Sequence, residues 1–311
     1  MDTQLVNLLA QIKGANKPPL WQGTATQARL RPMLMDSVFG PVPPVDAMEH
    51  VFIPSSQGHA LRLRLYTPTT PPKGLIVYLH GGGWVLGSVD SFHPFTATLS
   101  QRSGCAVLSV DYRLAPEAPF PLPLDDACAA IAWASVEGQA RTGTCGLPLM
   151  VMGDSAGANL ATTAARLHNE QPGRVPVGFQ ILAYPVTDCD FDRPSYRSYA
   201  EGYLLTRRDM IWFWDQYQPD TQRRTDPLAS PLRCTDLSAS PRALILTAEL
   251  DPLRDEGQAY CARLQASGVR AELVNCQGLV HGFLAMINLV PSAAWAFERI
   301  LQQISLETDP H

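Results

Sequence analysis

A short strand that turns sharply into a helix is the feature of this sequence that most constrains its fold. Residues 149–152 are apolar, the chain becomes alanine-rich after Gly157, and Gly153 and Gly157 flank Ser155 between the two segments. In so tight a turn, a side chain at either glycine would collide with neighbouring backbone. The turn exposes the serine hydroxyl, and the next N–H, that of Ala156, lies at a helix N-terminus that favours an anion. An ordinary strand-to-helix turn capped by the serine is the alternative.

The composition suits one large α/β domain as well as two small ones, and it argues against several kinds of partner. With 311 residues, 46% of them hydrophobic, the chain can bury a sizeable core. A net charge of −5 without a basic stripe disfavours nucleic acid and anionic membrane surfaces. The first residues carry no basic segment followed by a long apolar run, so we expect neither a secretory signal nor a transmembrane helix.

Seven cysteines are scattered along the chain without a Cys-x-x-Cys pair. Zinc ligation, redox chemistry and a disulfide framework therefore lack support. We expect the cysteines to be small buried hydrophobic side chains in a protein of the reducing cytoplasm.

Eight segments predict the strands of one sheet. Continuous apolar runs are typical of strands covered on both faces. Helical segments separate the later strands, which indicates the open, mostly parallel sheet of an α/β fold. The expected strands are Glu49–Pro54, Leu61–Tyr66, Leu75–Leu79, Ala106–Val110, Leu149–Met152, Val177–Ala183, Ala243–Ala248 and Ala271–Cys276. The expected helices among them are residues 94–102, 124–136, 253–267 and 292–304.

Two segments lack this alternation of strands and helices. Residues 1–45 show no strand alternation, and short helices expected near residues 5–12 and 24–37 suggest a piece that lies over the core. Residues 188–236 hold many aromatic side chains and a helix with Thr206 as its N-cap. We interpret this insertion as an aromatic lid over a pocket, with an ordinary amphipathic excursion as the alternative. Its aromatic residues are Tyr196, Tyr199, Tyr203, Trp212, Phe213, Trp214 and Tyr217.

A histidine and a carboxylate follow the last two expected strands, where a nucleophilic serine would need them. Attack on a carbonyl requires a base and a group that orients the base, and such groups gather at the carboxyl ends of parallel strands. His281 follows the last strand on a loop with glycines at both ends. Asp251 follows the strand before it and lies later in its loop than the rival Glu249, so we favour Asp251 as the orienting group. Its alternative role is to cap the next helix, and it could not easily do both.

Three consecutive glycines follow the third expected strand, in His80-Gly81-Gly82-Gly83-Trp84. Backbone donors without side chains can approach a developing oxyanion closely, so Gly82, Gly83 and Ala156 are the candidate donors. Three glycines in a row are costly to order, which favours this role over a flexible turn. We expect His80 and Trp84 to hold and wall the loop rather than to react.

Several blocks of the sequence together resemble one known family. They are His80-Gly81-Gly82-Gly83-Trp84, Asp111-Tyr112-Arg113-Leu114-Ala115-Pro116-Glu117, Phe120-Pro121, Gly153-Asp154-Ser155-Ala156-Gly157-Ala158-Asn159, Asp251-Pro252-Leu253-Arg254-Asp255-Glu256 and His281-Gly282-Phe283. In this order they resemble an α/β-hydrolase of the hormone-sensitive-lipase-like group of bacterial esterases. The resemblance implies Ser155 as nucleophile, Asp251 as acid and His281 as base, with Gly82 and Gly83 as oxyanion donors.

The resemblance also implies a division of the chain. Residues 1–45 would form N-terminal cap helices, and residues 46–311 an α/β-hydrolase catalytic domain with a cap insertion at 188–236. Many family members are said to dimerise through the last strand, here Ala271–Cys276, so a homodimer is one expectation. The candidates for the substrate pocket are Trp84, Tyr184, Leu204, Phe213 and Phe283.

The implied activity is hydrolysis of short- to medium-chain acyl esters through an acyl-enzyme. We expect a small-molecule ester substrate, a cytoplasmic location, no cofactor or metal, and no stable partnership with nucleic acid or membrane. An amide, lactone or thioester hydrolase with the same triad stays open. So does a non-catalytic small-molecule receptor, although such a receptor would be expected to have a broken triad.

Charged residues near the glycine loop have a structural interpretation. We expect Asp111 and Arg113 to form an ion pair that braces this loop, and Asp154 to be a buried, hydrogen-bonded neighbour of the serine turn.

Overall fold

Eight strands form one sheet in the computed structural model, which describes residues 1–31, 33–34, 38–45 and 47–309. The sheet order is β1-β2-β4-β3-β5-β6-β7-β8, antiparallel between β1, β2 and β4 and parallel from there on. The strands are β1 Ala47–Pro54, β2 Ala60–Thr67, β3 Leu75–Leu79, β4 Ala106–Val110, β5 Leu149–Asp154, β6 Phe179–Ala183, β7 Arg242–Leu250 and β8 Ala271–Val280. All eight predicted strands are confirmed, and β8 runs four residues further than expected.

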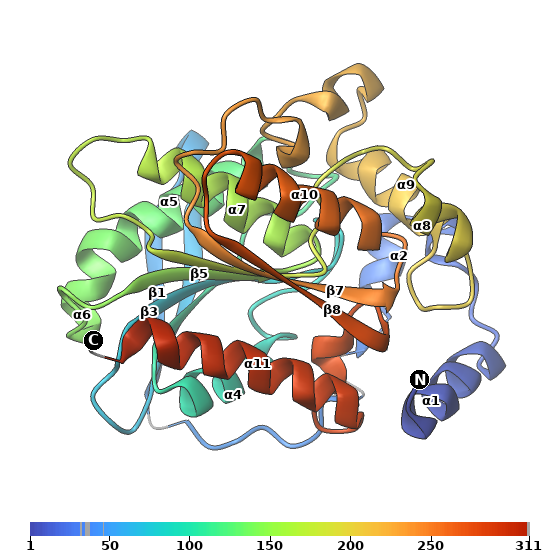
Figure 1. Cartoon of the computed structure of the whole chain (residues 1–311), viewed down its shortest axis with the longest axis horizontal. Coiled ribbons are helices and arrows are strands. Elements are labelled where there is room, and N and C mark those ends of the chain that lie inside the picture. Colours follow the sequence, from blue (N-terminus) through green and yellow to red (C-terminus); the bar gives the residue numbers. More distant parts are fainter. Residues whose placement is uncertain (32, 35–37, 46, 310–311) are drawn as a thin grey trace.

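Helices cover both faces of the sheet, which explains why its central strands are apolar throughout. Strands β3, β4, β5 and β6 are buried at every position. Figure 1 shows α4 and α11 on one face and α5, α7 and α10 on the other. Their bounds are α4 His93–Ser103, α5 Leu122–Trp133, α7 Ala156–Asn169, α10 Arg254–Ala266 and α11 Pro291–Thr308, and a π-turn at Ala134–Gly138 joins α5 to α6 Gln139–Thr142. The predicted helices are confirmed with shifted ends.

Two segments far apart in the sequence meet beyond the carboxyl ends of the parallel strands (Figure 1). The first contains α1 Thr3–Gly14, the 3₁₀ turn Leu20–Gln22 and α2 Ala25–Arg29; the second contains α8 Pro194–Ser198 and α9 Arg207–Tyr217. The Arg208 guanidinium of α9 lies 4.9 Å from the ring centroid of Trp21. Thr206 caps α9 as predicted, and its hydroxyl accepts the Asp209 N–H. The predicted helix over residues 24–37 is shorter, because α2 ends at Arg29, and residues 32 and 35–37 lie outside the described residues.

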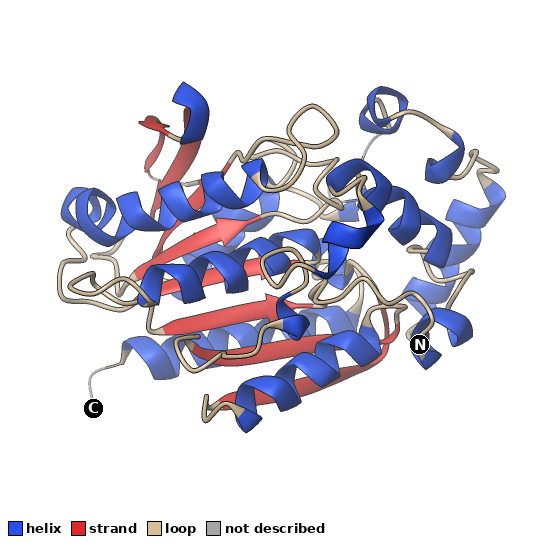
Figure 2. Ribbon diagram, turned by 90° about the horizontal axis from the view of Figure 1, so that it is seen from above, coloured by secondary structure: helices blue, strands red, loops and turns tan. Residues whose placement is uncertain are grey.

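Figure 2 shows how strongly the two edges of the sheet are turned relative to each other, as expected for a twisted open sheet. Shorter 3₁₀ turns occur at Ser56–Gly58, Thr221–Thr225, Pro231–Arg233 and Phe283–Met286. Over the described part of the chain, none of the helices has the length and apolar character needed to cross a membrane.

Asp111 and Arg113 do not pair with each other, so that prediction is wrong. Asp111 accepts a bond from the Arg62 guanidinium at 2.9 Å and another from the Val89 N–H. Arg113 instead binds the buried carboxylate of Asp126 on α5 through two nitrogens. The two residues follow the end of β4 and bind different elements. Asp111 links this segment to β2 and to Val89, and Arg113 links it to α5.

Candidate active site

Ser155 sits at the apex of the turn between β5 and α7. Its backbone has φ 54° and ψ −121°, a conformation that residues other than glycine rarely adopt. A Cβ at Gly153 would lie 2.5 Å from the carbonyl carbon of Gly157, and a Cβ at Gly157 would lie 2.0 Å from the Leu79 oxygen. Both positions therefore require glycine, for the reason that the sequence suggested.

Ser155, His281 and Asp251 form an unbroken line of hydrogen bonds, although 126 and 30 residues separate successive members. The Ser155 Oγ lies 2.9 Å from His281 Nε2, and His281 Nδ1 lies 2.8 Å from Asp251 Oδ2. A carboxylate can only accept, so Nδ1 carries the proton and Nε2 is free to accept the serine proton. Asp251 is fully buried, and the His281 side chain is 12% exposed. The geometry brings together the three residues expected from the sequence.

Asp251 orients His281 and does not cap the helix that follows it, because the N-cap of α10 is Leu253 and no side chain caps this helix. Its Oδ1 accepts the Leu253 N–H at 2.9 Å while Oδ2 accepts from His281. The bond from Leu253 lies in the turn before α10, and it fixes the carboxylate for the histidine. The rival Glu249 instead accepts the Gly278 N–H at 2.6 Å, so it supports the end of β8 rather than the imidazole.

Two of the candidate oxyanion donors, Gly82 and Gly83, line the same cavity as Ser155, and the third, Ala156, follows the serine directly. Gly82 has φ 116° and Gly83 has φ 61°, both in the region that glycine tolerates. Ala156 is the first residue of α7, so its N–H has no acceptor within the helix. In the described part of the chain, none of these three N–H groups donates to a loop or side-chain acceptor. Three unengaged donors near one hydroxyl suit a developing negative charge.

Asp154 connects the serine turn to the glycine loop. Its Oδ1 accepts from the Gly81 N–H at 2.8 Å and from the Tyr78 hydroxyl at 2.6 Å. Burial raises the pKa of Asp154 to about 6, and the bonds from Tyr78 and Gly81 and the nearby His281 oppose that rise. The expectation of a buried, hydrogen-bonded Asp154 is met, and the contact with Gly81 gives this residue a part in holding the glycine loop.

His80 holds this loop from within. Its Nδ1 donates to the Gly81 carbonyl at 2.7 Å, and its ring stacks on Tyr112 with centroids 4.3 Å apart. The ring is fully buried, and burial lowers the pKa of His80. A neutral, enclosed imidazole suits the supporting role that the sequence indicated.

A cavity of about 430 Å³ opens at Ser155 and His281. Three of the predicted wall residues, Tyr184, Leu204 and Phe213, line it. The other two do not. Trp84 is buried behind the wall, stacked on Tyr217 with centroids 4.1 Å apart, and Phe283 is buried against Tyr184 at 4.8 Å. Both are adjacent in sequence to site residues, but their side chains pack into the core, which a motif does not reveal.

Several pocket residues were not predicted from the sequence, because they belong to no motif. The N-terminal segment supplies Ile12, Lys17, Leu20, Arg31, Met33 and Leu34. Others come from elements already implicated, namely Phe92, Leu205, Asp209, Met210, Gly282 and Ala285. The helical spacing of the first residues predicted a piece over the core, but only the folded chain shows which side chains face the serine.

No metal site accompanies this pocket: the described residues contain no group of three or more His, Cys, Asp or Glu side chains arranged to hold an ion.

Comparisons with known proteins agree with one another. A family model described as alpha/beta hydrolase fold matches residues 76–285. The chain is 39% identical over 252 residues to an ethyl acetate hydrolase of Pseudomonas putida, which covers 80% of this chain and 79% of that protein. It is 40% identical over 242 residues to a carboxylesterase of Mycobacterium tuberculosis, covering 76% and 75% respectively. A solved esterase of Pyrobaculum calidifontis has a TM-score of 0.90 and 33% identity, covering 99% of this chain and 100% of that one.

Proposed function

The chain belongs to the α/β-hydrolase-fold family, within its hormone-sensitive-lipase-like group, and from this premise we propose that it cleaves short- to medium-chain acyl esters through an acyl-enzyme on Ser155. The chain is a carboxylesterase, in keeping with relatives named ethyl acetate hydrolase and carboxylesterase. The observation that carries the residue assignment is the line of hydrogen bonds from Asp251 through His281 to Ser155.

In the proposed first step, His281 Nε2 takes the proton of Ser155 as Oγ attacks the ester carbonyl carbon. The carbonyl π electrons move to oxygen, and Asp251 stabilises the imidazolium that forms. His281 then returns the proton to the leaving alcohol oxygen as the C–O bond breaks. Water adds to the acyl-enzyme by the same route and releases the carboxylic acid and free Ser155.

The tetrahedral oxyanion would be held by the N–H groups of Gly82, Gly83 and Ala156. Loss of one such donor typically costs about 10²–10³ in kcat. The α7 N-terminus adds positive potential at the same point. The chain's own backbone therefore supplies the charge stabilisation that an ester hydrolysis needs.

The size and character of the pocket support small apolar acyl groups. About 430 Å³ falls toward the lower end of ligand pockets in general, and apolar side chains such as Leu204, Met210 and Phe213 form much of the wall. Phe213 packs directly on the glycine loop, because a Cβ at Gly83 would lie 2.2 Å from its ring. Such a ring limits the space next to the reacting carbonyl.

The test is a panel of p-nitrophenyl esters from acetate to dodecanoate, paired with p-nitroanilides of the same acyl groups. We expect the highest kcat/KM at octanoate or shorter and much slower amide cleavage. Ser155→Ala should lower ester turnover by about 10⁶-fold with an unchanged circular-dichroism melt. A maximum at dodecanoate, or faster anilide cleavage, would contradict the substrate assignment, and an active Ser155→Ala protein would contradict the nucleophile.

Three further parts of the proposal rest on the family resemblance. Residues 1–45 and 188–236 act as the cap, which is supported by the pocket residues that both segments contribute. A cytoplasmic location is checked by cell fractionation, and a homodimer through β8 by light scattering.

A further inference from the structure

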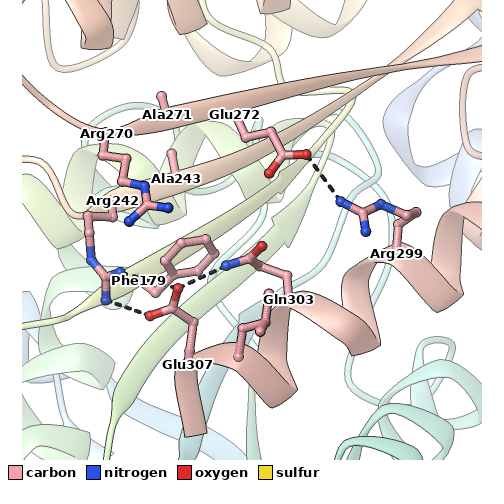
Figure 3. A pocket seen from close by; sticks show the side chains of 10 residues that line it. Phe179, Arg242, Ala243, Arg270, Ala271, Glu272, Arg299, Gln303 and Glu307 are labelled. Carbon is pink, nitrogen blue, oxygen red and sulfur yellow. Dashed lines mark hydrogen bonds and ion pairs between the residues drawn. The ribbon is translucent and has the colours of Figure 1, made fainter. Parts of the chain in front are cut away.

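We propose that the chain has a second binding site, for a small monocarboxylate with an apolar group, at the end of the sheet opposite Ser155. A cavity of about 330 Å³ opens where β6, β7 and β8 begin, beneath the last turns of α11 (Figure 3). Asp251 follows the far end of β7, which is nine residues long, so the two sites are about 30 Å apart. This cavity is therefore separate from the ester pocket.

Three arginines and two glutamates line this cavity, which leaves a surplus of one positive charge (3 − 2 = 1). Arg242 pairs with Glu307 at 2.5 Å, and Arg299 pairs with Glu272 at 3.1 Å. Arg270 has neither an ion pair nor a side-chain hydrogen bond to any residue that the structure describes. The surplus charge is thus located on one side chain.

Arg270 shares the cavity with a second arginine, Arg242. Figure 3 shows Arg270 extending toward Arg242 and the ring of Phe179. Because Arg242 already pairs with Glu307, Arg270 is the guanidinium whose N–H donors are open to an anion. The planar fork of arginine matches a carboxylate, which accepts two parallel N–H bonds.

The floor of the cavity suits an apolar group attached to that carboxylate. The Arg242 guanidinium lies 5.7 Å from the centroid of the Phe179 ring, and Phe179 itself is 5% exposed. Ala243, Ala271 and Leu306 extend the apolar lining around the ring. A single negative charge balances the surplus, whereas a phosphate dianion would exceed it and be repelled more strongly by Glu272 and Glu307. The ligand is therefore a monocarboxylate rather than a phosphate.

The test is a ligand-observed NMR titration of the full chain with benzoate, and with benzamide as its neutral counterpart. We expect benzoate to bind with a Kd of about 1 mM and benzamide at least about tenfold more weakly. Arg270→Gln should weaken benzoate binding at least about tenfold, and Arg270→Glu further still. Arg102→Gln is the matched control, because Arg102 is a half-exposed arginine on α4 that pairs with Glu298 outside this cavity.

Ester turnover supplies the second readout. Because Arg270 lies far from Ser155, both Arg270 variants should keep the wild-type kcat and KM, which separates this site from the ester pocket. The proposal is overturned if benzoate does not bind, if the Arg270 variants bind it as wild type does, or if benzamide binds equally well. A change in particle mass in the Arg270 variants would assign the residue to contact between copies and would also overturn it.

Discussion

Ser155 occupies a backbone conformation that costs about 1–3 kcal/mol for a residue other than glycine, and it persists only because the surrounding structure fixes it. The Ser155 N–H donates to the Ala183 carbonyl of β6 at 2.9 Å, which anchors the turn to the neighbouring strand. Glycines at 153 and 157 let α7 pack against β5 and β3. The sequence therefore predicts the turn through its glycines, while the strain at the serine follows from packing.

Asp251 and Glu249 offer a matched pair of substitutions in one loop. Asp251→Asn should lower kcat by about 10⁴-fold, because an amide donates where His281 Nδ1–H needs an acceptor and misorients the imidazole. Glu249→Gln should change kcat by less than about tenfold, because the amide oxygen still accepts the Gly278 N–H. Steady-state kinetics on p-nitrophenyl butyrate measure both. Greater damage from Glu249→Gln would show that the acid had been misassigned.

Asp154 should leave a signature in the pH dependence of turnover. The charged carboxylate holds the Gly81 N–H, and its pKa is about 6, so protonation weakens the support of the glycine loop below that pH. Asp154→Asn keeps an acceptor but loses the charge, and we expect kcat to fall about tenfold at alkaline pH. The contribution of Asp154 to the acid limb should be lost, so the pH–rate profiles of Asp154→Asn and wild type should differ in shape near pH 6. A profile that superposes on wild type after scaling would contradict this role.

The same group has a consequence for stability with a defined sign. Folding raises the pKa of Asp154 from 3.8 to about 6, so the folded state favours the neutral form. Its contribution to the free energy of unfolding is full below the unfolded pKa and is lost as the pH rises through about 6. Urea melts at pH 4 and pH 8 measure how much the free energy of unfolding falls between these pH values. This fall should be smaller for Asp154→Asn than for wild type. An equal fall in the free energy of unfolding in both proteins would show that a group other than Asp154 is responsible for it.

At the scale of elements, α9 sets the depth of the pocket through Phe213, whose ring packs on Gly83. Phe213→Ala should open space beside the reacting carbonyl and move the optimum of the ester panel toward longer acyl groups. Phe213→Leu, which refills most of the volume, should move it less. The relative kcat/KM values across the panel measure the shift. An unchanged optimum in Phe213→Ala would mean that the acyl group lies elsewhere.

The strands were predictable and the pocket wall was only partly so, for one physical reason. Burial on both faces makes a central strand apolar at every position, and this pattern is local in sequence. A pocket wall depends on which side chains two distant segments turn toward Ser155. Hence Trp84, beside the glycine loop, faces Tyr217 in the core, whereas Ile12 of α1 reaches the cavity. Asp111 and Arg113 illustrate the same limit, since each pairs across elements.

At the scale of the whole molecule, the reactivity of the cysteine thiols indicates whether the core is closed to solvent. Cys105, Cys234, Cys261 and Cys276 are buried, while Cys145 is exposed, so the expectation of buried cysteines holds for most but not all. Burial raises the pKa of Cys105 to about 11 and that of Cys276 to about 12, which keeps both as unreactive thiols.

A thiol reagent should therefore modify Cys145 first in the native protein and all seven cysteines after unfolding in urea. Peptide mass spectrometry identifies the modified residues, and Cys145→Ser serves as the control that should abolish the fast phase. A fast reaction at Cys105 or Cys276 in native protein would contradict the closed core.

The convergence of three distant loops on one hydroxyl is tested most directly by mass spectrometry after treatment with an organophosphate such as paraoxon. The account predicts one covalent adduct per chain, located on Ser155, absent from Ser155→Ala and formed far more slowly in His281→Ala. No adduct on folded wild-type protein, or an adduct on another residue, would contradict it.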